Sequence, residues 1–171
     1  LVKSLETDEH FGVGNNGEIF DVAFGLYAEK ELTAADGTVI PADGLIEIIT
    51  LDENGKGKVK TDLPMGNYYV KEIAANEAYL TSDTKYPVNF EYAGQDTAIV
   101  HLAVNDGEAI ENKLIYGSVS GKKTDEDGKG LGGAVIGIFK TGTEEFTKEH
   151  AILTTTSKDD GSFSFAKVPY G

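Results

Sequence analysis

Three residues of different types, Lys3, Glu72 and Asn112, carry side chains that can react with one another. A lysine amine attacks the carboxamide of an asparagine, ammonia leaves, and an amide bond joins the two side chains. A carboxylic acid beside them accepts and returns the protons that this exchange moves. Because the three residues are far apart in the sequence, the reaction requires a fold that brings distant segments together.

The segments around these residues alternate apolar and polar side chains, which is typical of half-buried strands. They read LVKSL (1–5), NYYVKEI (67–73) and EAIENKLI (108–115). Turn signals separate the segments, and helical periodicity is scarce, so the sequence predicts an all-β sandwich or barrel. Further strands are predicted at IEIITL (46–51), YPVNFEY (86–92), TAIVHLAV (97–104), GAVIGIFK (133–140) and GSFSFAKV (161–168).

The chain also repeats itself. AFGLYAEK (23–30) matches VIGIFKTG (135–142), and GKGKVKTDLPMG (55–66) matches GSFSFAKVPYG (161–171). Such self-similarity indicates two copies of one module. We expect a complete module at residues 1–115 and the N-terminal half of a second module at 116–171. Since the chain starts in a strand and stops after a turn-like segment, we also expect it to be a fragment of a longer protein.

The composition excludes several classes of function. The net charge is −14, from 15 basic and 29 acidic residues, which argues against nucleic acid and anionic membranes as partners. Cysteine is absent, so disulfides, zinc thiolate sites and cysteine catalysis are ruled out. No apolar run is long enough to span a bilayer, and we expect no membrane insertion in this fragment.

Several motifs resemble those of Cna B-type domains. KKTDEDGKGLGGAVIGIFK (122–140) resembles the opening of such a domain, and LPMGNYYVKEIAANEAYL (63–80) resembles its Pro-x-Gly-x-Tyr-x-x-x-Glu segment. IENKLIYGSVSGKK (110–123) resembles the junction between two such modules. The chain departs from the family pattern in AANEAY, which lacks the usual proline and glycine, and in a long insertion between Lys3 and the AFGLY strand.

The resemblance implies tandem Ig-like, transthyretin-like β-sandwich modules, of which the second is incomplete. It also implies a structural stalk segment of a Gram-positive adhesin or pilin, extracellular and anchored to the cell wall, whose partners are the neighbouring modules. It further implies an isopeptide bond between Lys3 and Asn112, with Glu72 as the catalytic acid. Burial favours both the neutral amine and the protonated carboxyl, which can donate hydrogen bonds to the Asn112 carbonyl oxygen and pass protons to the leaving ammonia. Packed sheets that hold the partners close supply the proximity, so the reaction needs no cofactor and occurs once, without turnover.

Alternatives remain for individual residues. Asn105 is a competing acceptor, although its Asn-Asp-Gly sequence indicates a turn. In the second module the matching lysine is Lys123, with Lys122 as second choice, and the matching acid and asparagine lie beyond Gly171. Lys85, in KYPV, weakly resembles a pilin linkage lysine, and an exposed strand lysine is the simpler interpretation.

Other functions leave weaker signals. DENGKG (52–57) and DEDGKG (125–130) resemble calcium loops but carry lysine at the fifth position, so we interpret them as acidic turns and predict no metal site. A rival function is a module that binds carbohydrate or a host matrix protein through the tyrosines of YAGQ (92–95) and NEAYL (76–80). A third interpretation is a transthyretin-like accessory domain without a crosslink.

Overall fold

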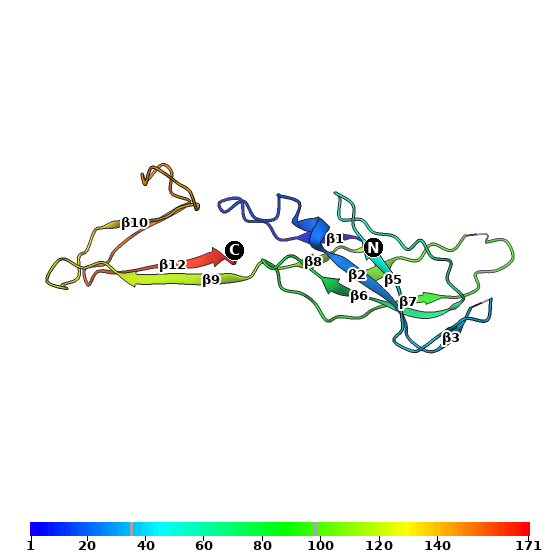
Figure 1. Cartoon of the computed structure of the whole chain (residues 1–171). Helices are drawn as coiled ribbons and strands as arrows, with labels where there is room; N and C mark the ends of the chain where they lie inside the picture. Colours follow the sequence, from blue (N-terminus) through cyan, green and yellow to red (C-terminus); the bar gives the residue numbers. More distant parts are fainter. Residues whose placement is uncertain (35, 98) are drawn as a thin grey trace. The chain divides into compact units, whose positions relative to one another are not determined.

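The structure, a computed structural model, describes residues 1–34, 36–97 and 99–171 and divides into two compact units (Figure 1). Unit 1 comprises Leu1–Thr7 and Gly14–Leu114, and unit 2 comprises Asp8–Val13 and Ile115–Gly171. The regular elements of the described residues are strands and two short 3-10 turns. The all-β class predicted from the alternating patterns is therefore confirmed.

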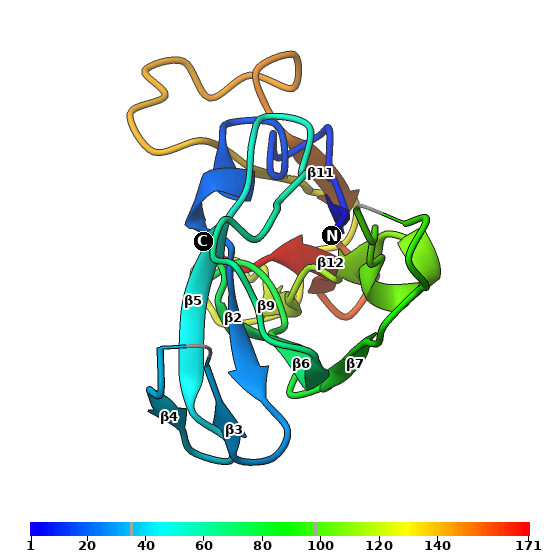
Figure 2. The same cartoon turned by 90° about the vertical axis from the view of Figure 1, so that its right-hand side faces the viewer.

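Unit 1 is built on a four-stranded antiparallel sheet in the order β5-β2-β6-β7. Its strands are β2 (Ala23–Ala28), β5 (Leu45–Thr50), β6 (Gly66–Ala74) and β7 (Tyr86–Phe90), and Figure 2 shows them side by side. Because side chains alternate across a strand, one face of this sheet is apolar and buried. Its core residues are Phe24, Leu26, Ile49, Tyr68, Val70 and Val88.

The ends of unit 1 meet in a second, two-stranded sheet. β1 (Lys3–Leu5) pairs in parallel with β8 (Ile110–Asn112), and Leu5 is opposite Asn112. Parallel strands need a long connection between them, and here that connection is the rest of the unit. Ile110 belongs to the same core cluster as the large sheet, and Leu1 and Leu5 pack against it. The odd-numbered residues of β1 therefore face the interior.

The smaller elements of unit 1 differ most from the prediction. A hairpin of β3 (Leu32–Thr33) and β4 (Val39–Ile40) and the turn η1 (Glu18–Asp21) were not predicted. The predicted strand 97–104 is wrong: residues 97 and 99–103 form no strand, Ala98 lies outside the described residues, and Val104 begins η2 (Val104–Gly107). The β-branched composition favours a strand, but a strand needs a neighbour, and these described residues pair with none.

Unit 2 repeats part of this architecture. β9 (Tyr116–Lys122) pairs antiparallel with β12 (Ser162–Pro169), and β10 (Val135–Ile138) pairs antiparallel with β11 (Leu153–Thr156). The β10–β11 pair corresponds to β2–β5, and the described part of unit 2 has no strands that correspond to β6, β7 and β8.

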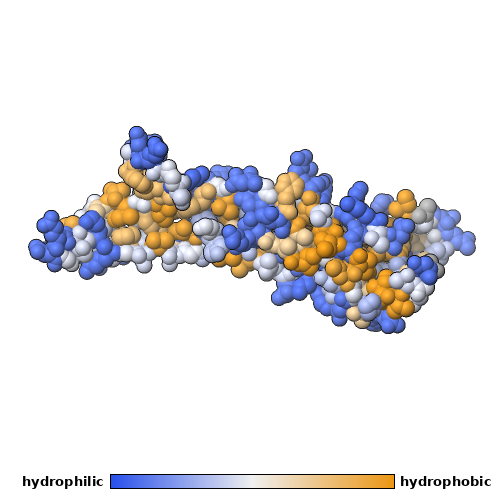
Figure 3. Space-filling model, in the orientation of Figure 1, coloured by the Kyte–Doolittle hydropathy of each residue, from blue (hydrophilic) through white to orange (hydrophobic). Residues whose placement is uncertain are grey.

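One packing detail supports the repeat. A Cβ on Gly25 would lie 2.5 Å from the Tyr27 ring, and one on Gly137 would lie 2.7 Å from the Phe139 ring. In both units a glycine therefore makes room for the aromatic ring two residues later. The prediction of two β modules is thus confirmed, and the second has fewer strands than the first among the described residues. Large apolar side chains of unit 2 remain exposed, Val119, Val135 and Phe146 among them, and Figure 3 shows apolar residues on its visible surface.

Candidate functional site

Lys3, Glu72 and Asn112 lie together in the interior of unit 1. They are 3%, 4% and 2% exposed. The Lys3 Nζ lies 3.7 Å from Glu72 Oε1, and the Asn112 Nδ2 donates a hydrogen bond of 2.7 Å to the same oxygen. One carboxylate oxygen therefore contacts both nitrogens that a crosslinking reaction would involve.

The strand pattern explains why these polar groups point inward. Glu72 continues the buried row of Tyr68 and Val70 on β6, since every second side chain faces the core. Asn112 follows Ile110 by two residues on β8, and both are buried. Lys3, at the start of β1, lies between Leu1 and Leu5, which both pack against the core. Each of the three residues thus occupies a core-facing position of its strand, where an apolar side chain is usual.

Hydrogen bonds satisfy the remaining polar atoms of the site. The Lys3 Nζ donates to the carbonyl oxygen of Ile110 at 3.0 Å, and the Ser82 main-chain N–H donates to Glu72 Oε2 at 3.0 Å. Among the described residues, every buried side-chain nitrogen and oxygen has a hydrogen-bond partner. Hydrogen bonds therefore hold Lys3, Glu72 and Asn112 in this arrangement without a covalent bond between them.

Burial changes the acid–base behaviour of the lysine. Desolvation lowers the pKa of the Lys3 ammonium from its ordinary value of 10.5, while the negative charges of Glu72 and Glu111 act in the opposite direction. Desolvation is the largest effect, because a charge loses its hydration in an apolar interior. The neutral, nucleophilic amine is accordingly easier to form here than on a surface lysine.

The Asn112 amide is oriented differently from our expectation. A protonated Glu72 was expected to donate to the Asn112 carbonyl oxygen, whereas the structure turns Nδ2 toward the carboxyl group. A carboxyl oxygen that carries no proton only accepts hydrogen bonds, so Oε1 takes the amide N–H of Asn112. The nitrogen that would leave as ammonia is the atom in contact with Glu72.

Lys123 occupies in unit 2 the backbone position that Lys3 occupies in unit 1. The Lys3 N–H donates to Gly55 O at 2.8 Å, and the Lys123 N–H donates to Gly161 O, also at 2.8 Å. A Cβ on Gly55 would lie 2.1 Å from Lys3 O, and one on Gly161 would lie 2.2 Å from Lys123 O. In backbone terms Lys123, and not Lys122, is the counterpart of Lys3.

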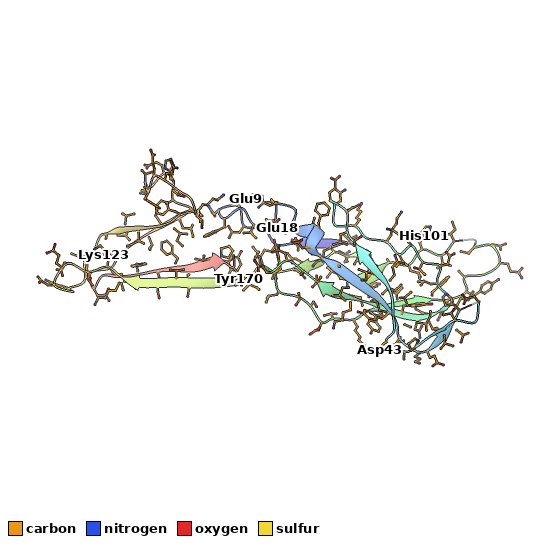
Figure 4. All side chains as sticks on the ribbon, in the orientation of Figure 1. Glu9, Glu18, Asp43, His101, Lys123 and Tyr170 are labelled. Carbon is orange, nitrogen blue, oxygen red and sulfur yellow. The ribbon has the colours of Figure 1, made fainter. Side chains whose placement is uncertain are left out.

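The surroundings of Lys123 differ from those of Lys3. It is exposed at the end of β9, where Figure 4 labels it, and its Nζ donates to Thr124 O at 2.8 Å. The strands that supply Glu72 and Asn112 in unit 1 have no counterparts in the described part of unit 2. The structure therefore brings Lys123 to neither an acid nor an asparagine of this kind.

The competing acceptor Asn105 and the possible linkage lysine Lys85 lie elsewhere in unit 1. Asn105 is exposed in η2, and its Nδ2 donates to Glu108 O at 3.2 Å, away from Lys3. Lys85 lies 3.0 Å from Asp43 and 4.1 Å from the centre of the Tyr69 ring. Hydrogen bonds to Asp43 and Tyr69 raise the pKa of Lys85, so its ammonium stays protonated and is a poor nucleophile.

The two tyrosines proposed for ligand binding differ in their exposure to solvent. Tyr79 is 3% exposed and donates a hydrogen bond to Glu6 O, whereas Tyr92 is 63% exposed. Tyr27 and Tyr69 do stack, with ring centres 5.0 Å apart. Gly25 lies against the Tyr27 ring, and Gly137 lies against the Phe139 ring of unit 2 in the same way. We therefore interpret the stack of Tyr27 on Tyr69 as packing within the fold.

Across residues 1–34, 36–97 and 99–171, no three His, Asp or Glu side chains gather as a metal site would require. In the described part of the chain, no helix has the length and apolar character needed to cross a membrane.

Sequence reasoning missed two main-chain contributors to the site. The Ser82 N–H has no side-chain signature, because any residue except proline supplies the same donor. Gly55, beneath Lys3, left a signal in the repeat, since the matched segments 55–66 and 161–171 both begin with glycine. Its positive φ of 70° requires glycine at this turn.

Comparison with known proteins identifies the domain type. Residues 12–105 and 117–171 match the family described as the SpaA prealbumin-like fold domain, which bears out the resemblance seen in the motifs. The chain superposes on the Bacillus anthracis TIE protein with a TM-score of 0.55 and 19% identity, over 88% of this chain. No curated protein sequence matches the chain significantly.

Two other solved structures are similar at lower scores. One is a C-terminal fragment of the pilus adhesin SpaC from Lactobacillus rhamnosus GG, with a TM-score of 0.44 and 14% identity over 97% of this chain and 68% of that one. The other is a streptococcal ancillary pilin, with a TM-score of 0.34 and 20% identity over 88% of this chain and 46% of that one. The chain spans 23% of the length of the TIE protein. At 19% identity, the likeness to the TIE protein shows the fold alone.

Proposed function

Because the chain belongs to the family of SpaA prealbumin-like fold domains, we propose that it is a stalk segment of a Gram-positive surface adhesin or pilin, stabilised by an internal crosslink. The family is one of structural pilin and adhesin domains and is not a class of enzymes. The proposed location is extracellular, on a protein anchored to the cell wall. The proposed partners are neighbouring modules.

The crosslink is an isopeptide bond between Lys3 and Asn112, and Glu72 is the proton carrier. The observation that supports it most is that Glu72 Oε1 contacts both the Lys3 Nζ, at 3.7 Å, and the Asn112 Nδ2, at 2.7 Å, where all three side chains are buried. Packed strands supply the proximity that a reaction between two side chains needs. The lowered pKa of Lys3 supports its role as nucleophile.

The proton transfers balance without a cofactor. Glu72 takes one proton from the Lys3 ammonium, and the neutral amine attacks Cγ of Asn112. The Nζ–Cγ bond forms and the Cγ–Nδ2 bond breaks. Both protons released by Nζ pass through Glu72 to Nδ2, which leaves as ammonium, and Glu72 returns to its ionised form.

We propose that residues 1–115 are one complete module and that residues 116–171 are the N-terminal half of another. The crosslink of the first module would close a loop of roughly a hundred residues and, by loop-closure entropy, stabilise it by roughly 4–5 kcal/mol. In the second module Lys123 is the proposed crosslink lysine. Its backbone contacts with Gly161 match those of Lys3 with Gly55, which supports this assignment.

Intact mass spectrometry tests the crosslink. The folded wild-type chain is expected to weigh less than its sequence by one ammonia, and tandem mass spectrometry of a digest should find Lys3 joined to Asn112. Lys3→Ala and Glu72→Gln are each expected to restore the full mass, because they remove the nucleophile and the proton carrier.

Two neighbouring surface residues provide matched controls. Lys113→Ala and Glu111→Gln change an exposed lysine and an exposed acid that pair with each other beside Asn112. Both variants should still lose ammonia. A wild-type chain whose mass equals that of its sequence would falsify the crosslink.

A further inference from the structure

The two oxygens of the Glu72 carboxylate contact different groups. Oε1 contacts the Lys3 Nζ and accepts the hydrogen bond from Asn112. Oε2 accepts a hydrogen bond of 3.0 Å from the main-chain N–H of Ser82. One oxygen therefore faces both nitrogens, and the other is held by the backbone.

This division depends on the orientation of the carboxylate plane. The terminal torsion of a glutamate is broad, so the side chain alone does not fix which way its oxygens point. A hydrogen bond from an N–H to an ionised carboxylate is short and strong compared with a neutral one. The Ser82 N–H thus supplies the restraint that the glutamate torsion lacks.

The backbone around Ser82 is itself anchored close to Asn112. The Leu80 N–H donates to Lys113 O at 2.9 Å, one residue after Asn112, and Tyr79 forms a bridge with Leu114. Within the same loop, the Ser82 hydroxyl donates a hydrogen bond to the Thr84 Oγ1 at 2.9 Å. The donor at Ser82 is therefore tied to the chain that carries the acceptor of the crosslink.

We propose that the main-chain N–H of Ser82 is a positioning group for the crosslinking reaction, holding Glu72 Oε2 so that Oε1 serves both Lys3 and Asn112. The inference rests on the proposed function. With Oε2 occupied by a donor, the proton that Glu72 takes from Lys3 resides on Oε1, next to the departing Nδ2. No atom of Ser82 forms or breaks a covalent bond.

Proline substitution removes the donor and leaves a matched control in the same loop. Ser82→Pro lacks the N–H, whereas Thr81→Pro places the same ring one residue earlier and keeps it. The variants are made by cell-free synthesis, and the loss of ammonia is followed over time by intact mass. We expect Ser82→Pro to react about 10- to 100-fold more slowly than Thr81→Pro, because a hydrogen bond to a charged group is lost.

A conservative variant separates positioning from folding. Ser82→Ala retains the N–H and should recover the rate of Thr81→Pro. If Ser82→Pro fails to fold, an ester in place of the amide at Ser82 removes the N–H without a ring, and the same slowing is expected. Equal rates for the donor-free and donor-bearing chains overturn this inference alone. A wild-type chain that never loses ammonia overturns the proposed function instead.

Discussion

At the scale of the residue, the proposed crosslink depends on the protonation state of the buried Lys3 amine. The Lys3 ammonium is buried, and its charge is offset mainly by the Glu72 carboxylate at 3.7 Å, with a smaller contribution from Glu111. Breaking such a pair by removing one partner leaves an uncompensated buried charge, which is strongly destabilising. Conversion of the amine to an amide in the proposed crosslink would remove the charge, so the reaction would also relieve an electrostatic cost of the chain without the crosslink.

This cost predicts a pH dependence for the chain that has not reacted. Burial lowers the pKa of Lys3, so between that pKa and 10.5 the unfolded chain binds more protons than the folded one. Stability must therefore rise with pH across this window, and the cost of charged Lys3 is complete below it. Denaturant unfolding of Asn112→Ala, which lacks the acceptor, should show the rise.

The matched chain for this experiment is Asn112→Ala combined with Lys3→Met. It lacks the titrating amine but keeps the other ionisable groups. The rise should be absent from it, and the difference between the two curves isolates Lys3. Identical curves would show that burial does not alter the lysine's protonation.

At the scale of the element, the tight turn ending at Gly55 holds β1 in register. A Cβ on Gly55 would lie 2.1 Å from Lys3 O, so any side chain there must displace the backbone of the reactive strand. Gly55 also adopts a φ of 70°, and Gly37, elsewhere in unit 1, adopts a φ of 87° with open space around it. Both glycines adopt a positive φ, but only at Gly55 would an added Cβ collide with another part of the backbone.

We expect Gly37→Ala to destabilise unit 1 by about 1–2 kcal/mol, the cost of a left-handed alanine. Gly55→Ala should cost about 1–3 kcal/mol more, because the contact with Lys3 O adds overpacking. Denaturant unfolding in the Glu72→Gln background measures both values. Gly55→Ala in the wild-type background should also lower the fraction of chain that loses ammonia. An equal loss in the free energy of unfolding for the two variants would mean that the backbone at Lys3 shifts without destabilising unit 1.

The strands show which parts of the fold the sequence predicts correctly and which it does not. Alternation in NYYVKEI and EAIENKLI predicted correctly that Glu72 and Asn112 lie on strands, because burial of every second residue is a local pattern. The segment 97–104 has the composition of a strand, but strand formation depends on a distant partner that composition does not encode. The Ser82 donor was not predictable, because a main-chain N–H is common to almost every residue.

At the scale of the whole molecule, the two units differ in how completely they are paired. The sheet of unit 1 has four strands, whereas β9 with β12 and β10 with β11 form pairs only. Isolated two-stranded pairs are marginally stable in water. Most of the buried core residues accordingly belong to unit 1, and Phe165 and Ser157 are among the few buried residues of unit 2.

Hydrogen–deuterium exchange should reveal this difference. Amides of β10 and β11 are expected to exchange much faster than those of β2 and β6, because the opening of a two-stranded pair costs little. The comparison is internal, since both units are measured in one sample. The same experiment on Glu72→Gln should accelerate exchange in unit 1 and leave unit 2 unchanged. Equal protection of β10 and β2 would contradict the inference that unit 2 is the less stable unit.

The parallel pairing of β1 with β8 has a mechanical consequence. When tension is applied to unit 1 through its outer ends, at Leu1 and at Leu114, these two strands slide along one another instead of peeling apart. The Lys3–Ile110, Ser4–Glu111 and Leu5–Asn112 pairs then resist together, and none is loaded first. A bond between Lys3 and Asn112 would carry the pull directly across this sheet, so the residues between them would stay folded while the chain is stretched.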